Sequence, residues 1–247
     1  MIPVKFKFYA TLLDAFQTYL NSDLIYQKYW GGSETPKWTQ EEFADKKFHE
    51  LLDTINRTPH ELNEKAEKGT AFNEVVDCLI LGCKSAKMEI TSLIKPGFIT
   101  AKTNGFTFDF PIPLCKEFAG YFAEAIPQVY VSGTIETKYG NVLLYGYVDE
   151  LLPLSVHDIK TTKQYNAFKF LHNWQHRIYP YCLMQMGNDI RLFEYNVTDF
   201  SNTYTETYVY DPEHDPGDIR LFCERFIEFL YLNADQITDK KIFAEDN

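Results

Sequence analysis

The sequence lacks any apolar stretch long enough to cross a bilayer, and its start has neither the apolar core nor the small-residue cleavage site of a signal peptide. We therefore expect no membrane partner and a cytoplasmic protein. Cysteine is also scarce: the five residues are odd in number and lie singly in apolar patterns, where a reduced thiol acts as a small buried hydrophobe. No disulfide framework is predicted.

Positive charge is short as well, with 24 Lys and Arg against 35 Asp and Glu, a formal charge of −11. Neutralisation of phosphates by Lys and Arg supplies most non-specific affinity for nucleic acids, so this balance counts against a nucleic-acid binder. It does not exclude one, because a metal site needs a local excess of carboxylates and net charge says nothing of how basic residues are distributed.

Apolar and aromatic residues are plentiful, at 45% and 16% of 247 residues, with 20 Phe and 17 Tyr. This composition excludes a disordered or fibrous chain and provides for a well-filled core. We expect a single domain over residues 1–247, mainly helical over 1–95, with an α/β core over 96–247.

Hydrophobic periodicity gives the expected order of elements. Helices are predicted over residues 9–20, 39–56, 59–67, 69–80, 113–125 and 165–186, and from 219 to the last apolar repeat near 230. Strands are predicted over 98–101, 106–110, 129–137, 142–151, 155–161, 190–197 and 203–210, with an Asn104-Gly105 hairpin turn and a meander over 129–161. Residues 31–36 and 211–218 are expected to be loops.

Charged residues interrupt two of the predicted apolar strands. Asp149 lies in the strand that ends at Leu151, and Asp158 and Lys160 lie in the next one. Because strand side chains alternate, Asp158 and Lys160 share one face, while His157 and Ile159 point to the other. An uncompensated buried charge is costly, so these groups are expected to converge.

Such a set suits metal-assisted hydrolysis of phosphodiesters. Carboxylates supply the hard oxygen ligands that Mg²⁺ prefers, and a lysine can orient water or stabilise developing negative charge. A D-x-K tripeptide taken alone is more often a structural ion pair between strands. The wider sequence context decides between these readings.

That context resembles the RecB-like branch of the PD-(D/E)XK nuclease superfamily. The stretch Gly146 to Asp149 matches the glycine and aspartate that end one strand, and Asp158-Ile159-Lys160-Thr161 matches D-x-K-T on the next. The helix motif Q-x-x-x-Y follows as Gln175 and Tyr179, which the i, i+4 spacing puts on one helix face. The resemblance implies catalytic roles for Asp149, Asp158 and Lys160, supported by Gln175 and Tyr179.

An upstream helix adds a partial match. The family pattern G-T-x-x-H, or G-T-x-x-E in phage-exonuclease-like relatives, ends in a metal ligand, and here Gly69-Thr70-Ala71-Phe72-Asn73 puts Asn73 in that position. Asn73 could coordinate through its amide oxygen, or Glu74 could take over. Asn73 also lies one turn from Asp77, on the same helix side.

The resemblance implies a restriction-endonuclease-like α/β core, a mixed central β-sheet flanked by helices, with N-terminal helical additions. It implies hydrolysis of DNA with Mg²⁺ or Mn²⁺ bound by Asp149, Asp158 and Asn73 or Glu74, most directly by an exonuclease of recombination, repair or phage DNA metabolism. DNA ends, and an annealing protein or a helicase, are the implied partners. Cys182 and Cys223 are too far apart for the late cysteine trio of iron-sulfur members, so no cluster is expected. Two alternatives stay open: a degenerate fold that binds nucleic acid or acts as a scaffold, and a structure-specific endonuclease.

Overall fold

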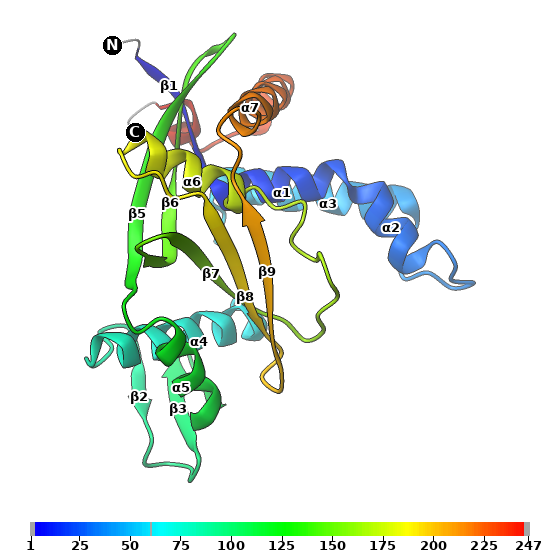
Figure 1. The fold of residues 1–247 in the computed structure, drawn as a ribbon. Coiled ribbons are helices and arrows are strands. Elements are labelled where there is room, and N and C mark those ends of the chain that lie inside the picture. The colour runs from blue at the N-terminus through cyan, green and yellow to red at the C-terminus, as the bar shows by residue number, and fades with distance from the viewer. Residues whose placement is uncertain (1–2, 60, 245–247) are drawn as a thin grey trace.

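The computed structural model describes residues 3–59 and 61–244 (Figure 1). Its centre is a six-stranded mixed sheet. The strands are β1 (Val4–Tyr9), β5 (Ile126–Thr137), β6 (Gly140–Leu152), β7 (Ser155–Thr161), β8 (Leu192–Thr198) and β9 (Thr203–Val209). β5, β6 and β7 form the predicted antiparallel meander, β8 adds parallel to β7, and β9 pairs antiparallel with β8. The mixed central sheet expected from the sequence is confirmed.

The long strand β6 has different neighbours along one of its edges. β5 pairs along nearly the whole length of its other edge, whereas β1 pairs only with residues 141–145 and β7 only with residues 150–152. The intervening residues 146–149 have no ladder partner on that edge among the described strands. Here a Cβ added to Gly146 would lie 2.7 Å from Cε1 of Tyr179, so the absence of a side chain lets a helix approach closely.

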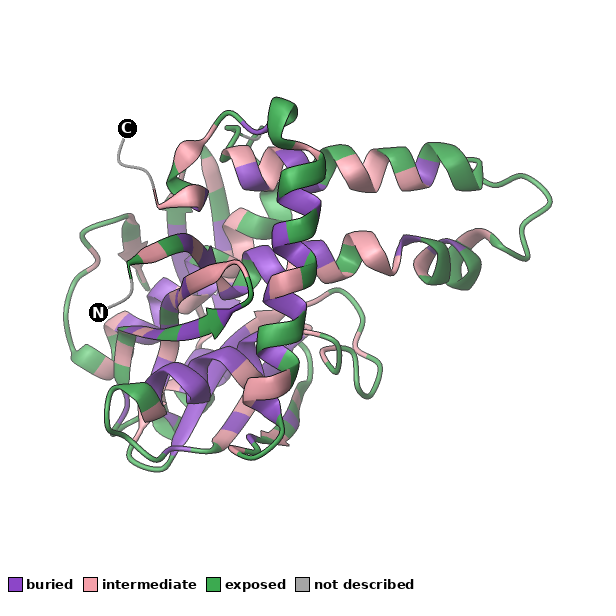
Figure 2. Ribbon diagram, turned by 90° about the horizontal axis from the view of Figure 1, so that it is seen from above, coloured by how far each residue is buried: buried purple, intermediate pink, exposed green. Residues whose placement is uncertain are grey.

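Helices α1 (Ala10–Leu20), α6 (Gln175–Gln185) and α7 (Asp215–Leu232) pack with the sheet to form the main core. The Phe8, Phe16 and Phe226 rings meet at its centre, with centroids 4.9 Å and 4.8 Å from that of Phe226. α3 (Gln40–Asn56) begins next to its predicted start at residue 39, where Thr39 and Glu42 form a capping box. α2 (Ser22–Trp30) and the facing end of α3 project from the body and are largely exposed (Figure 2).

A second, smaller core lies on the other side of β7. It consists of α4 (Glu64–Leu81), α5 (Ile112–Tyr121) and a three-stranded sheet of β2 (Glu89–Thr91), β3 (Phe98–Thr103) and β4 (Phe106–Pro111). The β3–β4 hairpin turns through Asn104 and Gly105, both at positive φ, as predicted. Val156 belongs to the first core and Ile159 to the second, so the predicted alternation of β7 is confirmed.

The helix predicted over residues 59–67 does not begin at Pro59. Thr58 and Pro59 are both irregular, and His60 lies outside the described residues. α4 instead begins at Glu64, where the Asn63 side chain accepts a hydrogen bond from the backbone N–H of Lys65 at 2.9 Å. The two helices expected over 59–80 are one.

The long helix predicted over residues 165–186 is also too long, because residues 163–174 are irregular and α6 begins only at Gln175. Two distant carboxylates hold this segment. Glu206 accepts from the N–H groups of Lys169 and Phe170 at 2.7 and 3.2 Å, and Asp14 accepts from that of Trp174.

The amino-terminal part is mainly helical, as expected, but strands β1 and β2 within it were missed. The predicted loop over 211–218 is shorter, because α7 begins at Asp215. Two short 3₁₀ helices, η1 (Ala234–Gln236) and η2 (Lys240–Phe243), follow it. No helix within the described ranges is long and apolar enough to span a membrane.

Candidate active site

The site is built on the face of β7 that looks toward α6. Asp158 and Lys160 both project from this face, and Lys160 Nζ lies 2.7 Å from Asp158 Oδ2. The Asp158 side chain is buried, with only 3% of its residue surface exposed. Lys160 and Asp158 lie two positions apart on the same strand face, and their ion pair neutralises the Asp158 charge, which would otherwise be costly to bury.

Gln175, the first residue of α6, joins the two charges. Its Nε2 donates to Asp158 Oδ1 at 2.6 Å, and its Oε1 accepts from Lys160 Nζ at 2.9 Å. The same Nε2 lies 3.5 Å from the hydroxyl of Tyr179, one turn further along α6. An amide suits this place because it carries a donor at one end and an acceptor at the other.

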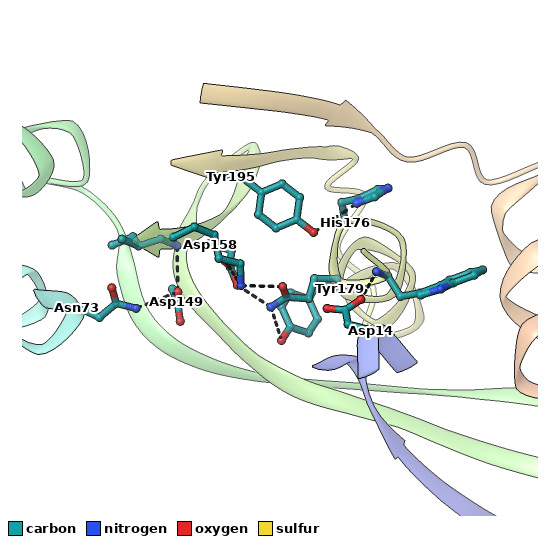
Figure 3. Close-up of polar contacts among 11 residues, drawn as sticks. Asp14, Asn73, Asp149, Asp158, His176, Tyr179 and Tyr195 are labelled. Atoms are coloured by element: carbon teal, nitrogen blue, oxygen red, sulfur yellow. Dashed lines mark hydrogen bonds and ion pairs between the residues drawn. The ribbon is translucent and has the colours of Figure 1, made fainter. Parts of the chain in front are cut away.

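Asp149 lies beside this cluster, where β6 and β7 separate (Figure 3). The ladder between the strands stops at Glu150 and His157, and Asp149 Oδ2 accepts the backbone N–H of Ile159 at 3.0 Å. It also accepts from Nδ2 of Asn73 on α4 at 3.2 Å. Apart from Glu74, the residues singled out from four separate motifs therefore lie in two neighbouring groups, Asn73 with Asp149 and the cluster around Gln175.

Burial and neighbouring charges shift the pKa values of Asp149 and Lys160. Burial, then the nearby charge of Asp158, raises the pKa of Asp149 to about 7. Burial alone would lower the pKa of Lys160, but the attraction and hydrogen bond of Asp158 raise it. Lys160 therefore stays protonated at neutral pH. The Asp149 and Asp158 carboxylates repel one another unless a proton or a cation lies between them.

The oxygen atoms of the site are of the kind that a divalent metal ion binds. Among the described residues, the buried Asn73 Oδ1 has no hydrogen-bond partner, and it lies next to Asp149. With Asp158, the set is two carboxylates and one amide oxygen on neighbouring elements. These are the hard oxygen ligands that Mg²⁺ and Mn²⁺ accept. Within residues 3–59 and 61–244, no three His, Cys, Asp or Glu side chains are grouped closely enough to hold a metal ion. The residues fit a cation only if Asn73 takes part.

The structure does not bring Glu74 into this set. Its carboxylate instead accepts from Ser85 Oγ at 2.7 Å and from Lys87 Nζ at 2.6 Å. Glu74 is one residue from Asn73 and points elsewhere because successive helix residues are turned by about 100°. The alternative that Glu74 replaces Asn73 as a ligand has no support in this arrangement.

Two acidic residues near the site, Asp14 and Glu150, were not singled out from the sequence. Asp14, on α1, accepts the Trp174 N–H at the start of α6, and burial raises its pKa to about 7. Glu150 is fully buried beside Asp77, and burial followed by the charge of Asp77 raises its pKa to about 9. The sequence signal for Asp14 was an acid within an apolar helical stripe.

Comparisons with known proteins give little further information. No family model matches the chain, and no curated protein matches it. Among solved structures, the crystal structure of SSO0001 is similar over 93% of this chain and 79% of that chain, at 13% identity and a TM-score of 0.44. At this level of similarity the alignment assigns neither fold nor function.

Proposed function

We propose that this protein is a metal-dependent nuclease with a restriction-endonuclease-like core of the PD-(D/E)XK type, which hydrolyses phosphodiester bonds of DNA. One observation carries the proposal: residues from four separate sequence motifs lie together. Asp158, Lys160, Gln175 and Tyr179 form one connected group of polar contacts, and Asp149, which is hydrogen-bonded to Asn73, lies close enough for the charges of Asp158 and Lys160 to act on its pKa. A structural ion pair explains the contact of Asp158 with Lys160 but gives no reason for Asp149 and Asn73 to lie beside it.

The residues divide the chemistry among them. Asp149, Asp158 and the amide oxygen of Asn73 would hold Mg²⁺ or Mn²⁺, which when bound stabilises charge on phosphoryl oxygens and acidifies water. Lys160 carries a fixed positive charge next to these acids and is suited to orient a water or to stabilise an oxyanion. Gln175 holds Asp158 and Lys160 in register, and the Tyr179 hydroxyl lies next to its amide.

The same resemblance makes an exonuclease of recombination, repair or phage DNA metabolism our first proposal for its role. DNA ends would be its substrate, in the cytoplasm, with an annealing protein or a helicase as a partner. A closed circular DNA separates this role from that of a structure-specific endonuclease, because an exonuclease leaves it intact.

The test is cleavage of end-labelled linear duplex and single-stranded DNA with Mg²⁺ or Mn²⁺. We expect metal-dependent products from the wild type, and a rate lower by about 10²–10³ or more in Lys160→Met and in Asp158→Asn, since each removes a charge at the reacting phosphate. Lys102→Met is the matched control, because Lys102 pairs with Glu89 on the small sheet. Equal rates in all variants would overturn the assignment of the site.

One observation favours a second function, a nuclease fold that binds nucleic acid without cutting it. Asn73 is neutral, and no third acid joins Asp149 and Asp158 within the described residues. In that case the wild type binds DNA but leaves it intact, and Asn73→Glu tightens Mn²⁺ binding by adding a charged ligand.

A further inference from the structure

Three lysines gather around one cavity. Lys65 and Lys68 lie one turn apart on α4, and Lys163 follows the end of β7. Together with Thr161, Thr162, Asp199 and Phe200 they line a cavity of about 520 Å³, which we call the lysine groove. Residues at i and i+3 lie on the same side of a helix, so Lys65 and Lys68 face the groove together.

These ammonium groups are not neutralised by the protein. Among the residues that the structure describes, no carboxylate forms an ion pair with any of the three, and Lys68 Nζ lies 3.9 Å above the Phe200 ring. Other lysines do have carboxylate partners, namely Lys46, Lys47, Lys87, Lys95, Lys102 and Lys138.

The acid in the lining does not cancel this charge by a direct contact. Asp199 accepts the N–H groups of Ser201 and Asn202 at 2.9 and 2.7 Å, and these bonds fix its carboxylate in the β8–β9 turn. In a chain with a net charge of −11, three unpaired lysines on one concave surface indicate an anionic ligand.

The groove adjoins the candidate active site through both of its walls. On one wall Thr161 directly follows Lys160, and on the other Gly69 directly follows Lys68 on the helix that carries Asn73 one turn later. The two walls touch at this point, because a Cβ at Gly69 would lie 2.9 Å from Thr161 Oγ1. A chain of phosphates lying in the groove would therefore lie beside the end of β7 that carries Lys160, and near Asn73 along α4.

We propose that the lysine groove holds the phosphodiester backbone of a polynucleotide strand whose next bond lies at Asp158 and Lys160, with one phosphate near each of Lys65, Lys68 and Lys163. This inference rests on the proposed function, since it names where that substrate lies. It also explains how an acidic protein binds a polyanion, because three unpaired lysines are gathered on one concave surface.

The test measures binding without cleavage. Labelled single-stranded and duplex DNA are titrated with the full-length protein in EDTA over a range of salt, and anisotropy is recorded. The groove variant is Lys65→Gln, Lys68→Gln, Lys163→Gln. The control variant is Lys5→Gln, Lys37→Gln, Lys84→Gln, which changes net charge equally at exposed lysines in β1, after α2 and after α4.

We expect the groove variant to bind single strands at least tenfold more weakly at ~0.1 M salt, and its slope of log K against log salt to fall by about 2, at ~0.7 per lost phosphate contact. The control should keep the wild-type slope to within about 0.5. Equal affinity and slope in wild type and groove variant, or equal losses in groove and control variants, would overturn the proposal.

The groove and the nuclease function can fail separately. If the wild type cleaves DNA but the groove variant binds as the wild type does, the groove proposal is wrong and the nuclease stands. If the groove variant loses binding but the wild type cleaves nothing with Mg²⁺ or Mn²⁺, the groove stands and the nuclease is wrong. A wild type that binds no polynucleotide contradicts the groove outright.

Discussion

Gln175 is the side chain whose replacement most sharply probes the arrangement at Asp158 and Lys160. Only 3% of its surface is exposed, and it makes one hydrogen bond to each charge. A hydrogen bond to a charged group contributes about 1.5–3 kcal/mol, while the Asp158–Lys160 ion pair stays in place and limits the loss. Gln175→Met, similar in size, should therefore lower the free energy of unfolding by about 2–4 kcal/mol.

Gln175→Glu adds a pH dependence of known sign. It keeps an acceptor for Lys160 but turns a second carboxylate toward Asp158, so the folded protein binds a proton more tightly than the unfolded chain does. A raised folded-state pKa gives stability that is present at low pH and lost as pH rises through that pKa. The variant should be more destabilised, relative to wild type, at pH 8 than at pH 5.

Urea unfolding in EDTA at both pH values, followed by tryptophan fluorescence, measures both effects. Gln185→Glu, at the exposed far end of α6, is the control and should change stability by no more than about 0.5 kcal/mol. A Gln175→Met variant within about 0.5 kcal/mol of wild type, or a Gln175→Glu variant as stable as wild type at pH 8, would refute the bridging role.

Two further substitutions test the scaffold of the site. Burial raises the pKa of Asp14 to about 7 from an ordinary 3.8, so its contribution to stability is full below about pH 4 and is lost as pH rises through 7. Asp14→Asn keeps an acceptor, so it should gain about 1–3 kcal/mol over wild type between pH 4 and 8 in urea unfolding; a pH-independent difference would contradict this. In Gly146→Ala the new Cβ would lie 2.7 Å from the Tyr179 ring, so we expect a loss of about 1–3 kcal/mol, seen as a fall in Tm of about 2–4 °C for each kcal/mol. An unchanged Tm would mean that α6 moves aside freely.

Several strands, turns and helix starts could be predicted because the residues that determine them are close together in the sequence. The alternation in β7 put Asp158 and Lys160 on one face, and the Asn104-Gly105 turn fixed the β3–β4 hairpin. Thr39, where the helix over 39–56 was predicted to begin, is the N-cap of α3. Each of these features is decided by residues a few positions apart.

Features that depend on distant partners were missed. β1 alternates Val4, Phe6 and Phe8, but three apolar positions are a weak strand signal, and its partner β6 is more than a hundred residues away in sequence. Residues 163–174 have helical periodicity, yet their backbone donates to Glu206 and Asp14 instead.

The sequence predicted which residues belong to the site, but it did not predict which of them contact one another. The motifs named Asn73 and Glu74 as competing ligands, and only the rotation of α4 distinguishes them, with Asn73 on Asp149 and Glu74 on Lys87. Asp14 reaches α6 only through the packing of α1, and a lone acid in a helix carries no spacing that would reveal this.

The central claim is that this cluster of acids and amides is a cation site. Titration of the wild type with Mn²⁺ by isothermal calorimetry tests it most directly, because binding needs no knowledge of the preferred nucleic acid. We expect saturable binding that weakens at least tenfold in Asp149→Asn and in Asp158→Asn and is unchanged in Asp189→Asn, whose carboxylate pairs with Arg191 on the surface. Wild-type affinity in both site variants would contradict the account.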